Sequence, residues 1–554
     1  MKERSRNAAG TGRRSRCPAV WLLLVITALM LVSCTLTRET DVSGTYDALF
    51  GSGKDILRIV AGSENRVLEP ILDAYARKEK IRIAVDYHGS LDIMRMLQGG
   101  TVPYDAVWPA SSLWISLGDE THRVRHASST SITPVVLGVR RDLAGELGWT
   151  GRQVYVRDLL TAIREGKLRF TMTSATQSNS GASAYIGFLY ALLDEPAEIT
   201  LADLQDPGLQ DDLRELLGGI ERSSGSSDWL KDLYLKGDYD AMMNYEALII
   251  DANRTLEAEG RETLYVIYLE DGTLLADSPL GFVTQNGEEG RDEAHQEALF
   301  RALQDHLLSE PVQLEIQKTG RRTDMNGVAP GLESIFRSDQ GIDTERILSP
   351  INMPRAEVLM AALDLYQNEL RRPGYNIYLL DHSGSMSGRG ISQLRSALDL
   401  IMDQERSGAL LLQASEEEIN VFIPFSDYCY GPLTAQGPDE LEALRDAVQN
   451  TRVGGGTALF EAVREALRLL DSTDLGGRRP AVIVLTDGMN TSPGSMEEVE
   501  AAYRALDLDV PIFAILFGDA HADELEGLAA FSHGRVFDGR EDLVQAFATV
   551  RGYN

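Results

Sequence analysis

The stretch Asp381–Ser385 (DHSGS) follows the apolar run 377–380, and it decides how the C-terminal third of this chain folds. A short apolar run that ends in polar residues is typical of a buried strand reaching one edge of a sheet. Two further polar residues hold matching places: Thr457 follows three glycines, and Asp487 follows the apolar run 481–485. Since the carboxyl ends of parallel strands meet at one edge, we expect these three segments to lie close together.

The side chains gathered in this way are suited to a divalent cation. Mg²⁺ prefers oxygen ligands in near-octahedral geometry and usually keeps several waters. Two carboxylates and three hydroxyls leave residual positive charge and an open position for an acidic side chain from a protein partner. We therefore expect Mg²⁺ as the cofactor, with Mn²⁺ or Ca²⁺ as alternatives. The expected ligands are Asp381, Ser383, Ser385, Thr457 and Asp487.

The surrounding pattern predicts a Rossmann-like sheet of mainly parallel strands. Apolar runs at 419–425 and 511–517 alternate with helical spacing at 391–401 and 459–470. With its DxSxS motif, later threonine and second aspartate in order, the segment 373–554 resembles the von Willebrand factor A (VWA) domain. The resemblance implies a metal-ion-dependent adhesion site made of the five residues above. A VWA domain that folds without metal is the alternative.

The first 33 residues have the features of a bacterial secretory signal. Six basic residues and one acidic residue precede an apolar segment from about 19 to 32. This segment is short for a membrane-spanning helix, which needs about 20 residues. Leu31–Cys34 (LVSC) resembles the lipobox, in which the cysteine is lipidated, and an uncleaved anchor is the alternative. We expect a lipoprotein held by Cys34 on the extracytoplasmic face of the cell membrane, with 34–54 as a flexible tether.

The chain is strongly acidic, with a formal net charge of −31. Loss of residues 1–33, which carry a net charge of +5, would leave −36. Such a surface disfavours nucleic acids and anionic lipids as partners, although solubility alone also accounts for it. Cys17 and Cys34 belong to the signal and lipid anchor, so Cys429 remains alone. We therefore expect no structural disulfide.

From residue 55 onward, short apolar runs alternate with amphipathic helices, a pattern that predicts α/β structure with parallel sheets. As a whole pattern, residues 55–345 resemble the type II extracellular solute-binding proteins. The resemblance implies two lobes that the chain crosses near 134–139 and 280–283, with a ligand in the cleft between them. Lobe one would be 55–137 plus 281–345, and lobe two would be 138–280.

By the same resemblance, four side chains would face the cleft: Ser63, Ser90, Ser180 and Tyr245. The alternative is that these serines only cap helices, since serine is a preferred N-cap residue. No basic residue is assigned to the cleft at this stage. A small solute or oxyanion captured there would depend on backbone N–H groups and hydroxyls.

Residues 346–372 form a linker with a predicted helix, so little chain separates the two modules. The leading interpretation is a membrane-anchored lipoprotein that binds a protein partner or ligand through the VWA site, coupled to a solute-binding-like module. The alternative is the solute receptor of an ABC-type transporter with an accessory VWA domain. An enzyme is disfavoured, because the sequence has no GxSxG elbow, HExxH motif, CxxC pair or complete phosphate loop.

Overall fold

The computed structural model describes residues 46–100, 102–285, 292–324, 327–347, 351, 353–517, 522–540, 543–551 and 553. The predicted signal segment and Cys34 lie outside these ranges. The architecture is α/β throughout, which confirms the predicted fold class: two mixed sheets lie in residues 48–283, and a mainly parallel sheet lies in residues 374–538. We call the first part the solute-binding-like module, with lobes one and two, and the second part the VWA domain, after the predicted resemblances. Within the described residues, no helix combines the length and apolar character needed to cross a bilayer.

The sheet of lobe one takes strands from two distant parts of the sequence. Its order is β1 (Ala48–Gly51), β3 (Arg82–His88), β2 (Ile56–Gly62), β4 (Ala106–Trp108), β12 (Pro279–Val283) and β5 (Val124–Ser129). In this sheet β2 pairs parallel with β3 and with β4. The other pairs are antiparallel: β1 with β3, β12 with β4, and β5 with β12. The sheet is therefore mixed, whereas the sequence pattern predicted a parallel one.

Strand β1 also corrects the predicted tether, which ran to residue 54. Ala48 and Phe50 are partly buried against the lobe-one core, and the strand pairs with β3 from Ala48↔Val85 to Gly51↔Arg82. Three consecutive apolar residues, 48–50, thus belong to an edge strand of the sheet.

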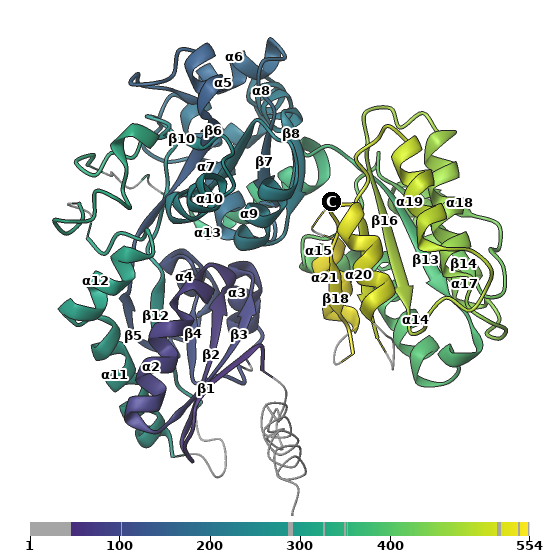
Figure 1. Cartoon of the computed structure of the whole chain (residues 1–554), viewed down its shortest axis with the longest axis horizontal. Coiled ribbons are helices and arrows are strands. Elements are labelled where there is room, and N and C mark those ends of the chain that lie inside the picture. Colours follow the sequence, from purple (N-terminus) through teal and green to yellow (C-terminus); the bar gives the residue numbers. More distant parts are fainter. Residues whose placement is uncertain are drawn as a thin grey trace, which may run out of the picture. The chain divides into compact units, whose positions relative to one another are not determined.

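Helices of lobe one also come from both ends of the module, as the purple and teal ribbons in Figure 1 show. They are η1 (Ser63–Leu68), α2 (Glu69–Glu79), α3 (Ser90–Gln98), α4 (Ser112–Gly118), α11 (Glu293–Leu307) and α12 (Glu310–Lys318). Phe300 and Leu303 of α11 join Leu57 and Ile59 of β2 in one buried cluster. This packing ties the returning chain to the lobe in which the module begins.

Lobe two has its own sheet, in the order β10 (Leu264–Ile267), β6 (Thr133–Arg140), β9 (Ala241–Tyr245), β7 (Phe170–Thr173) and β8 (Ile220–Ser224). A short strand, β11 (Leu275–Ala276), also pairs with β6. Its helices are α5 (Arg141–Glu146), α6 (Val156–Arg164), α7 (Asn179–Leu192), η2 (Asp203–Gln205), α8 (Pro207–Gly218), α9 (Ser227–Lys236) and α10 (Glu246–Ala258). Helix α7 is buried almost all round, which fits its nearly uncharged sequence.

The chain crosses between the two sheets twice, and each crossing takes only a few residues. It leaves β5 at Ser129 and enters β6 at Thr133, and it returns between β11 and β12, from Ala276 to Pro279. A third segment touches this region, since Ile132 and Arg322 form an isolated antiparallel bridge. Three stretches of chain therefore meet where the lobes join.

The linker contains η3 (Ser338–Gln340), α13 (Ala356–Leu365) and a π-helical turn, η4 (Tyr366–Leu370). Leu359 and Leu363 of α13 are fully buried in the same apolar cluster as Phe188 of α7. The linker helix is thus packed on lobe two rather than exposed along its length.

The VWA domain is built on a sheet in the order β15 (Leu433–Gln436), β14 (Ile419–Phe425), β13 (Gly374–Asp381), β16 (Arg479–Thr486), β17 (Ile512–Leu516) and β18 (Val536–Asp538). Every neighbouring pair is parallel except β14 with β15. Around it lie η5 (Gly384–Met386), α14 (Arg389–Met402), α15 (Gln404–Ala409), α16 (Gly437–Ala443), α17 (Arg445–Gln449), α18 (Leu459–Asp471), α19 (Met496–Ala505), α20 (Ala522–Phe531) and α21 (Leu543–Arg551). The central strand β13 is buried along its whole length, so its last residue is placed precisely.

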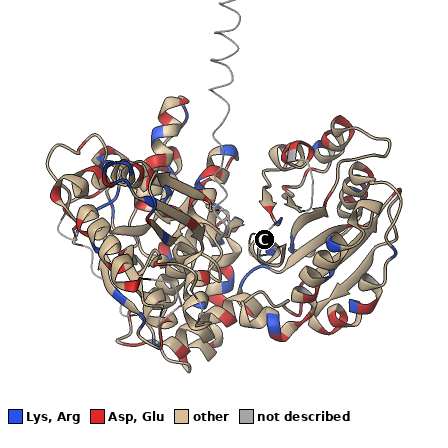
Figure 2. Cartoon of the chain, turned by 90° about the horizontal axis from the view of Figure 1, so that it is seen from below, with Lys and Arg blue, Asp and Glu red and all other residues tan. Residues whose placement is uncertain are grey.

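Acidic positions occur on helices and loops of both the solute-binding module and the VWA domain (Figure 2). This distribution agrees with the formal net charge of −31. The negative charge is therefore a general property of the surface.

Candidate functional sites

The first candidate site lies at the carboxyl end of β13 and β16. These strands run in parallel register, with Leu380 opposite Leu485, so Asp381 and Thr486 end the two strands side by side. Asp381 is fully buried. Its Oδ1 accepts a hydrogen bond from the backbone N–H of Ser383 at 2.7 Å, and its Oδ2 accepts one from the Thr486 hydroxyl at 2.6 Å. The carboxylate is thus held in one orientation.

A chain of short contacts continues outward from Asp381. The hydroxyl oxygens of Ser383 and Ser385 lie 2.9 Å apart, and the Ser385 hydroxyl donates to Oδ1 of Asp487 at 2.7 Å. A Cβ atom added at Gly488 would lie 3.5 Å from the Thr457 hydroxyl and 3.7 Å from that of Ser385. The five residues expected to bind metal are therefore brought together from three loops.

The glycine-rich loop before Thr457 is fixed from two sides. The N–H of Gly384 donates to the carbonyl of Gly455 at 3.0 Å, and the N–H of Thr457 donates to the Thr491 hydroxyl at 2.7 Å. Gly454 and Gly455 have φ values of 154° and 87°, which side chains other than glycine rarely adopt. The glycines therefore allow Thr457 to approach the DxSxS loop.

Charge and donor type at this edge fit a hard divalent cation. Burial raises the pKa of Asp381, while the hydrogen bonds from Thr486 and Ser383 lower it. In the described part of the chain, no cluster of three or more His, Cys, Asp or Glu side chains is arranged for a metal. The five-residue set has only two such residues, and its remaining donors are hydroxyls. Magnesium accepts such oxygen-rich, partly hydrated surroundings.

Two exposed apolar side chains flank this edge. Tyr428 is 59% exposed and Met489 is 47% exposed. Asp427, next to Tyr428, accepts the N–H of Gly456 at 2.5 Å, and Met489 is two residues after Asp487. Apolar and aromatic side chains beside a polar centre are typical of protein interfaces.

The second candidate site lies where lobe one meets lobe two. Ser63, at the start of η1, has its hydroxyl 3.0 Å from that of Ser226, which caps α9 in the other lobe. A Cβ atom at Gly89 would lie only 2.5 Å from the carbonyl oxygen of Gln177. The two lobes are therefore in direct contact along the loops that were expected to hold a ligand.

The other expected ligand residues are all buried, and each has a hydrogen-bonding partner within one lobe. Ser180 has its hydroxyl 2.8 Å from that of Ser227, and Tyr245 accepts a hydrogen bond from the Asn179 amide at 2.9 Å. Ser90 instead accepts the N–H of Ala110 at 3.0 Å, a contact within lobe one. Ser90 therefore has a structural contact within lobe one, although the N-cap of α3 is Gly89 and not Ser90.

Three buried polar residues in η1 and after α12 were missed by the sequence reasoning: Glu64, Asn65 and Arg321. Arg321 donates through Nη1 to the hydroxyls of Ser131 at 3.1 Å and Ser278 at 3.4 Å, and through Nη2 to the carbonyl of Glu64. The available signal was the paired Arg321-Arg322 after Gly320. Sequence alone did not show which of the two arginines would reach the interface.

These groups affect one another electrostatically. Burial raises the pKa of Glu64 to about 7, and Arg321 opposes that rise. Burial lowers the pKa of Arg321, and Glu64 opposes that fall. Tyr245 has its pKa raised by burial and then by the charge of Glu64. A carboxylate, a guanidinium and a phenol therefore share one poorly hydrated region.

Arg322, the next residue, forms a buried ion pair instead. Its guanidinium makes two bonds to the carboxylate of Glu246, at 2.8 Å and 2.7 Å, and both side chains are fully buried. Tyr268 adds a third contact, 3.2 Å from the guanidinium. The pair links the returning segment to the N-terminus of α10 in lobe two.

The VWA domain contacts the segments that form the lobe interface. The Gln177 amide donates to the carbonyl of Ala548 in α21 at 3.0 Å, and the rings of Trp229 and Tyr553 lie 4.9 Å apart. From lobe one, Arg95 donates to the carbonyl of Leu410 at 2.7 Å. The VWA domain thus touches both lobes.

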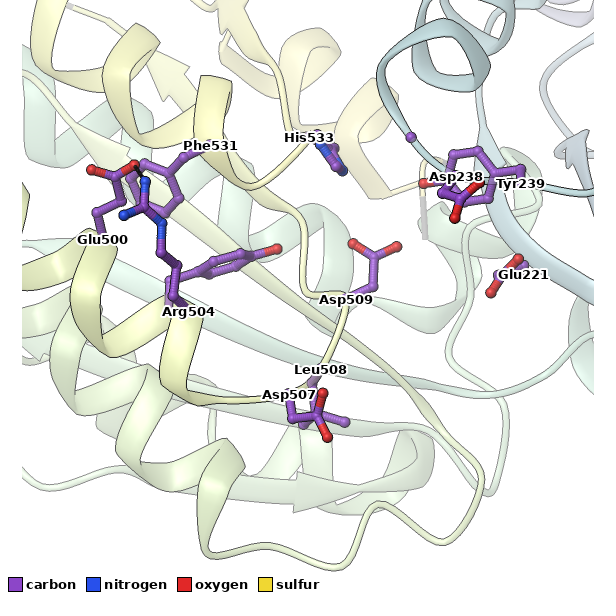
Figure 3. A pocket seen from close by; sticks show the side chains of 12 residues that line it. Glu221, Asp238, Tyr239, Glu500, Arg504, Asp507, Leu508, Asp509, Phe531 and His533 are labelled. Carbon is purple, nitrogen blue, oxygen red and sulfur yellow. Dashed lines mark hydrogen bonds and ion pairs between the residues drawn. The ribbon is translucent and has the colours of Figure 1, made fainter. Parts of the chain in front are cut away.

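A more polar part of the same contact contains a cavity of about 700 Å³. Asp509 and His533 of the VWA domain lie opposite Glu221, Asp238 and Tyr239 of lobe two (Figure 3). At this border Arg222 donates to Asp509 at 2.7 Å. The domain contact is therefore apolar around Trp229 and charged around Arg222.

Comparison with known families agrees with this architecture. The family model described as bacterial extracellular solute-binding protein matches residues 57–322, and that of the von Willebrand factor type A domain matches residues 377–545. The chain therefore joins a solute-binding domain to a C-terminal VWA domain, and both predicted resemblances are confirmed. Domains of these kinds are typically binding or adhesion modules, and the first family indicates an extracytoplasmic location.

The similar proteins match only parts of the chain. A Synechocystis sp. protein, sll0103, is 26% identical over 205 residues, which cover 37% of this chain and 45% of that protein. Human inter-alpha-trypsin inhibitor heavy chain H4 is 31% identical over 182 residues, 30% of this chain and 19% of the relative. The chain thus spans less than half the length of these curated relatives.

Among solved structures, the sulfate-binding protein SubI from Mycobacterium tuberculosis H37Rv has 16% identity and a TM-score of 0.38, covering 54% of this chain and 93% of its own. A von Willebrand factor type A protein from Catenulispora acidiphila has 18% identity and a TM-score of 0.28, covering 33% and 42%.

Proposed function

We propose that this protein is a membrane-anchored, extracytoplasmic lipoprotein that binds a protein partner through a Mg²⁺-dependent VWA site and carries a solute-binding module. The observation that supports it most is the hydrogen-bonded set Asp381, Ser383, Ser385 and Asp487, with Thr457 beside it. When bound there, Mg²⁺ would supply a coordination position for an acidic side chain of the partner. Tyr428 and Met489 would provide apolar contacts around that position.

Thermal melting tests the metal part of this proposal. With Mg²⁺ at about 100 times its dissociation constant, the protein should melt about 2 °C higher than in EDTA if it unfolds as one unit. Asp381→Ala should abolish the shift, because it removes the buried carboxylate of the DxSxS motif. Ser385→Ala, at the outer side of the set, should weaken it.

The matched control is Asp399→Ala on α14. Asp399 is an acidic residue of the same domain that pairs with Arg445, so its replacement removes one charge without touching the set. The metal-dependent shift should persist in this variant. Equal melting of the wild-type protein in Mg²⁺, Mn²⁺ and EDTA would leave a VWA domain without a metal role.

Coupling between the two modules is supported by the placement of their contacts. Gln177 is three residues before the candidate ligand residue Ser180. Trp229 is two residues after Ser227, whose hydroxyl lies 2.8 Å from that of Ser180, so α21 and Tyr553 touch segments beside this candidate. A change at the lobe interface would alter these contacts, and the reverse also holds because binding linkage is reciprocal. Calorimetry of Tyr553→Ala tests this coupling.

A solute receptor for an ABC-type transporter remains the second candidate. The buried polar groups at the lobe interface favour a ligand there independently of the VWA site. The two roles differ in the partner: capture of a permease by the two lobes, unaffected by Asp381→Ala, would support the transporter role. Partner capture that requires Asp381 would support the adhesion role.

A further inference from the structure

Three polar atoms of η1 and of the segment after α12 are buried without a hydrogen-bond partner in the described part of the chain. They are Oε1 of Glu64, Oδ1 of Asn65 and Nε of Arg321. The three side chains are 6%, 1% and 2% exposed, so solvent does not satisfy them. Native structures rarely leave buried polar atoms unpaired, and clusters of them need an explanation.

Their location points to a ligand between the lobes. Glu64 and Asn65 belong to η1, directly after Ser63, which contacts Ser226 of lobe two. The charge of Glu64 acts on Tyr245, and that of Asp228 acts on Glu64, so its carboxyl group is close to charged and polar groups of lobe two. The Glu64 carboxyl group, with its unpartnered Oε1, therefore lies near the contact between the lobes.

Arg321 is fixed in place before any ligand arrives. Its two terminal nitrogens are held by Ser131 and Ser278, one from each crossing segment, and by the carbonyl of Glu64. A guanidinium held in this way keeps its orientation and has Nε left to donate. It is a preorganised site for a carboxylate or another small anion.

The charges also restrict the ligand. Glu64 and Arg321 form no ion pair with each other among the described residues, although each influences the other's charge. A dianion would be repelled by the Glu64 carboxylate, and a simple cation would be repelled by the Arg321 guanidinium. A ligand that carries one charge of each sign satisfies both groups at once.

We propose that the lobe interface binds a small zwitterion of the amino-acid class, with its carboxylate at Arg321 and its ammonium group at Glu64 and Asn65. This proposal rests on the solute-binding role of the module and names its ligand class. It does not depend on the VWA metal site.

Isothermal titration calorimetry and thermal shift on the purified protein test the ligand class with defined probes. The probes are the twenty standard L-amino acids, first pooled and then single, with sodium sulfate and sodium molybdate as dianions and maltose as a neutral solute. We expect at least one amino acid to bind and to raise the melting temperature. Glu64→Gln and Arg321→Gln should each weaken binding at least about tenfold.

The matched control is Glu69→Gln, which removes a carboxylate five residues from Glu64. Glu69 accepts a hydrogen bond from the Tyr87 hydroxyl at 2.9 Å within lobe one, so amino-acid binding should be unchanged in this variant.

If Arg321→Gln does not fold, Glu64→Gln and the pH dependence of binding to the wild-type protein provide the test. Ionised Glu64 pairs with ammonium, and the charged or titratable groups that act on it are Arg321, Asp228 and Tyr245. Affinity should therefore fall as the pH is lowered below about 7.

Two results would overturn the proposal. Binding of sulfate or molybdate that becomes tighter in Glu64→Gln would identify an oxyanion site, and the solute-binding role would stand. Binding of none of the twenty amino acids would also overturn the zwitterion, whereas binding of maltose in the same titrations would leave the solute-binding role standing with a neutral ligand.

Discussion

Asp381 and Glu64 are both carboxylic acids shielded from water, but their surroundings differ. The Asp381 carboxylate receives hydrogen bonds on both oxygens, and Glu64 has one oxygen without a partner among the described residues. Burial raises the pKa of each group. The first is suited to a metal that replaces lost hydration, and the second to a ligand that brings its own donor.

Glu64 makes the stability of the protein depend on pH. Its pKa rises from 4.5 to about 7 on folding, so the folded state holds this proton more tightly than the unfolded state. Stability from this group is therefore complete below about pH 4.5 and is lost as the pH rises to about 7, by about 3 kcal/mol. In urea denaturation from pH 4.5 to 8, Glu64→Gln should lack this loss.

Glu69→Gln serves as the reference in this series, because it removes a nearby carboxylate with a different partner. It should retain the wild-type loss of stability between pH 4.5 and 7. If the urea midpoint of the wild-type protein changes with pH over this range in the same way as that of Glu64→Gln, the assignment is wrong.

The sequence predicted which residues would gather at the edge of the VWA sheet, because local pattern and topology agree there. Asp381, Ser383 and Ser385 directly follow a buried strand, and Asp487 follows its parallel neighbour, so strand ends alone bring them together. Arg321 was beyond reach, because its burial depends on Ser131 and Ser278 from the two crossing segments. Such contacts between distant segments leave no periodic signal in the sequence.

At the scale of secondary structure elements, the antiparallel strands were the least predictable. The apolar residues 280–283 indicate a strand, but 124–129 (VRHASS) have no apolar pattern, and the direction in which β5 and β12 pair depends on the chain returning to lobe one. Strand β1 was placed in the tether for a similar reason, since its pairing with β3 is settled by the exposed edge of that strand. The parallel core of each lobe follows more directly from alternating strands and helices.

The segment carrying Arg322 and the helix α10 are joined by a buried ion pair. Arg322→Met would leave Glu246 charged and unpaired in a fully buried place, which should cost about 3–5 kcal/mol. Arg322→Met combined with Glu246→Gln should recover much of this loss, because no buried charge remains. The midpoint of urea denaturation, followed by circular dichroism, measures both effects.

Arg337→Met is the corresponding control on the surface. Arg337 pairs with Asp339 and Glu257, but these side chains are 33%, 51% and 44% exposed. Solvent screens such pairs, so the change in stability should stay below about 1 kcal/mol. A similar cost for Arg322→Met and Arg337→Met would show that the buried pair contributes no more than a surface pair.

For the whole molecule, the contacts of the VWA domain with both lobes predict that the modules unfold together. Tyr553 packs on Trp229 and on Phe513, and Gln177 and Arg95 bond to backbone carbonyls of the VWA domain. Tyr553→Ala removes a large buried ring, which typically costs about 3–5 kcal/mol. In differential scanning calorimetry we expect one transition for the wild-type protein and two for this variant.

Phe460→Ala distinguishes loss of contact from simple loss of stability. Phe460 lies in an apolar cluster formed entirely by VWA residues, so its removal weakens that domain without touching lobe two. This variant should melt earlier but still in one transition. Two transitions in the wild-type protein would mean that the modules are thermodynamically independent.

Addition of Mg²⁺ then turns the same variants into a test of communication. If the metal binds the VWA domain and the domains are coupled, Mg²⁺ should raise the single transition of the wild-type protein, so that the solute-binding module is stabilised as well. In Tyr553→Ala, Mg²⁺ should raise only the VWA transition and leave the other at its metal-free temperature. If Mg²⁺ still raises both transitions of the variant, coupling would have to pass through contacts other than those of Tyr553. The first of these to remove is the hydrogen bond from Arg95 to the carbonyl of Leu410.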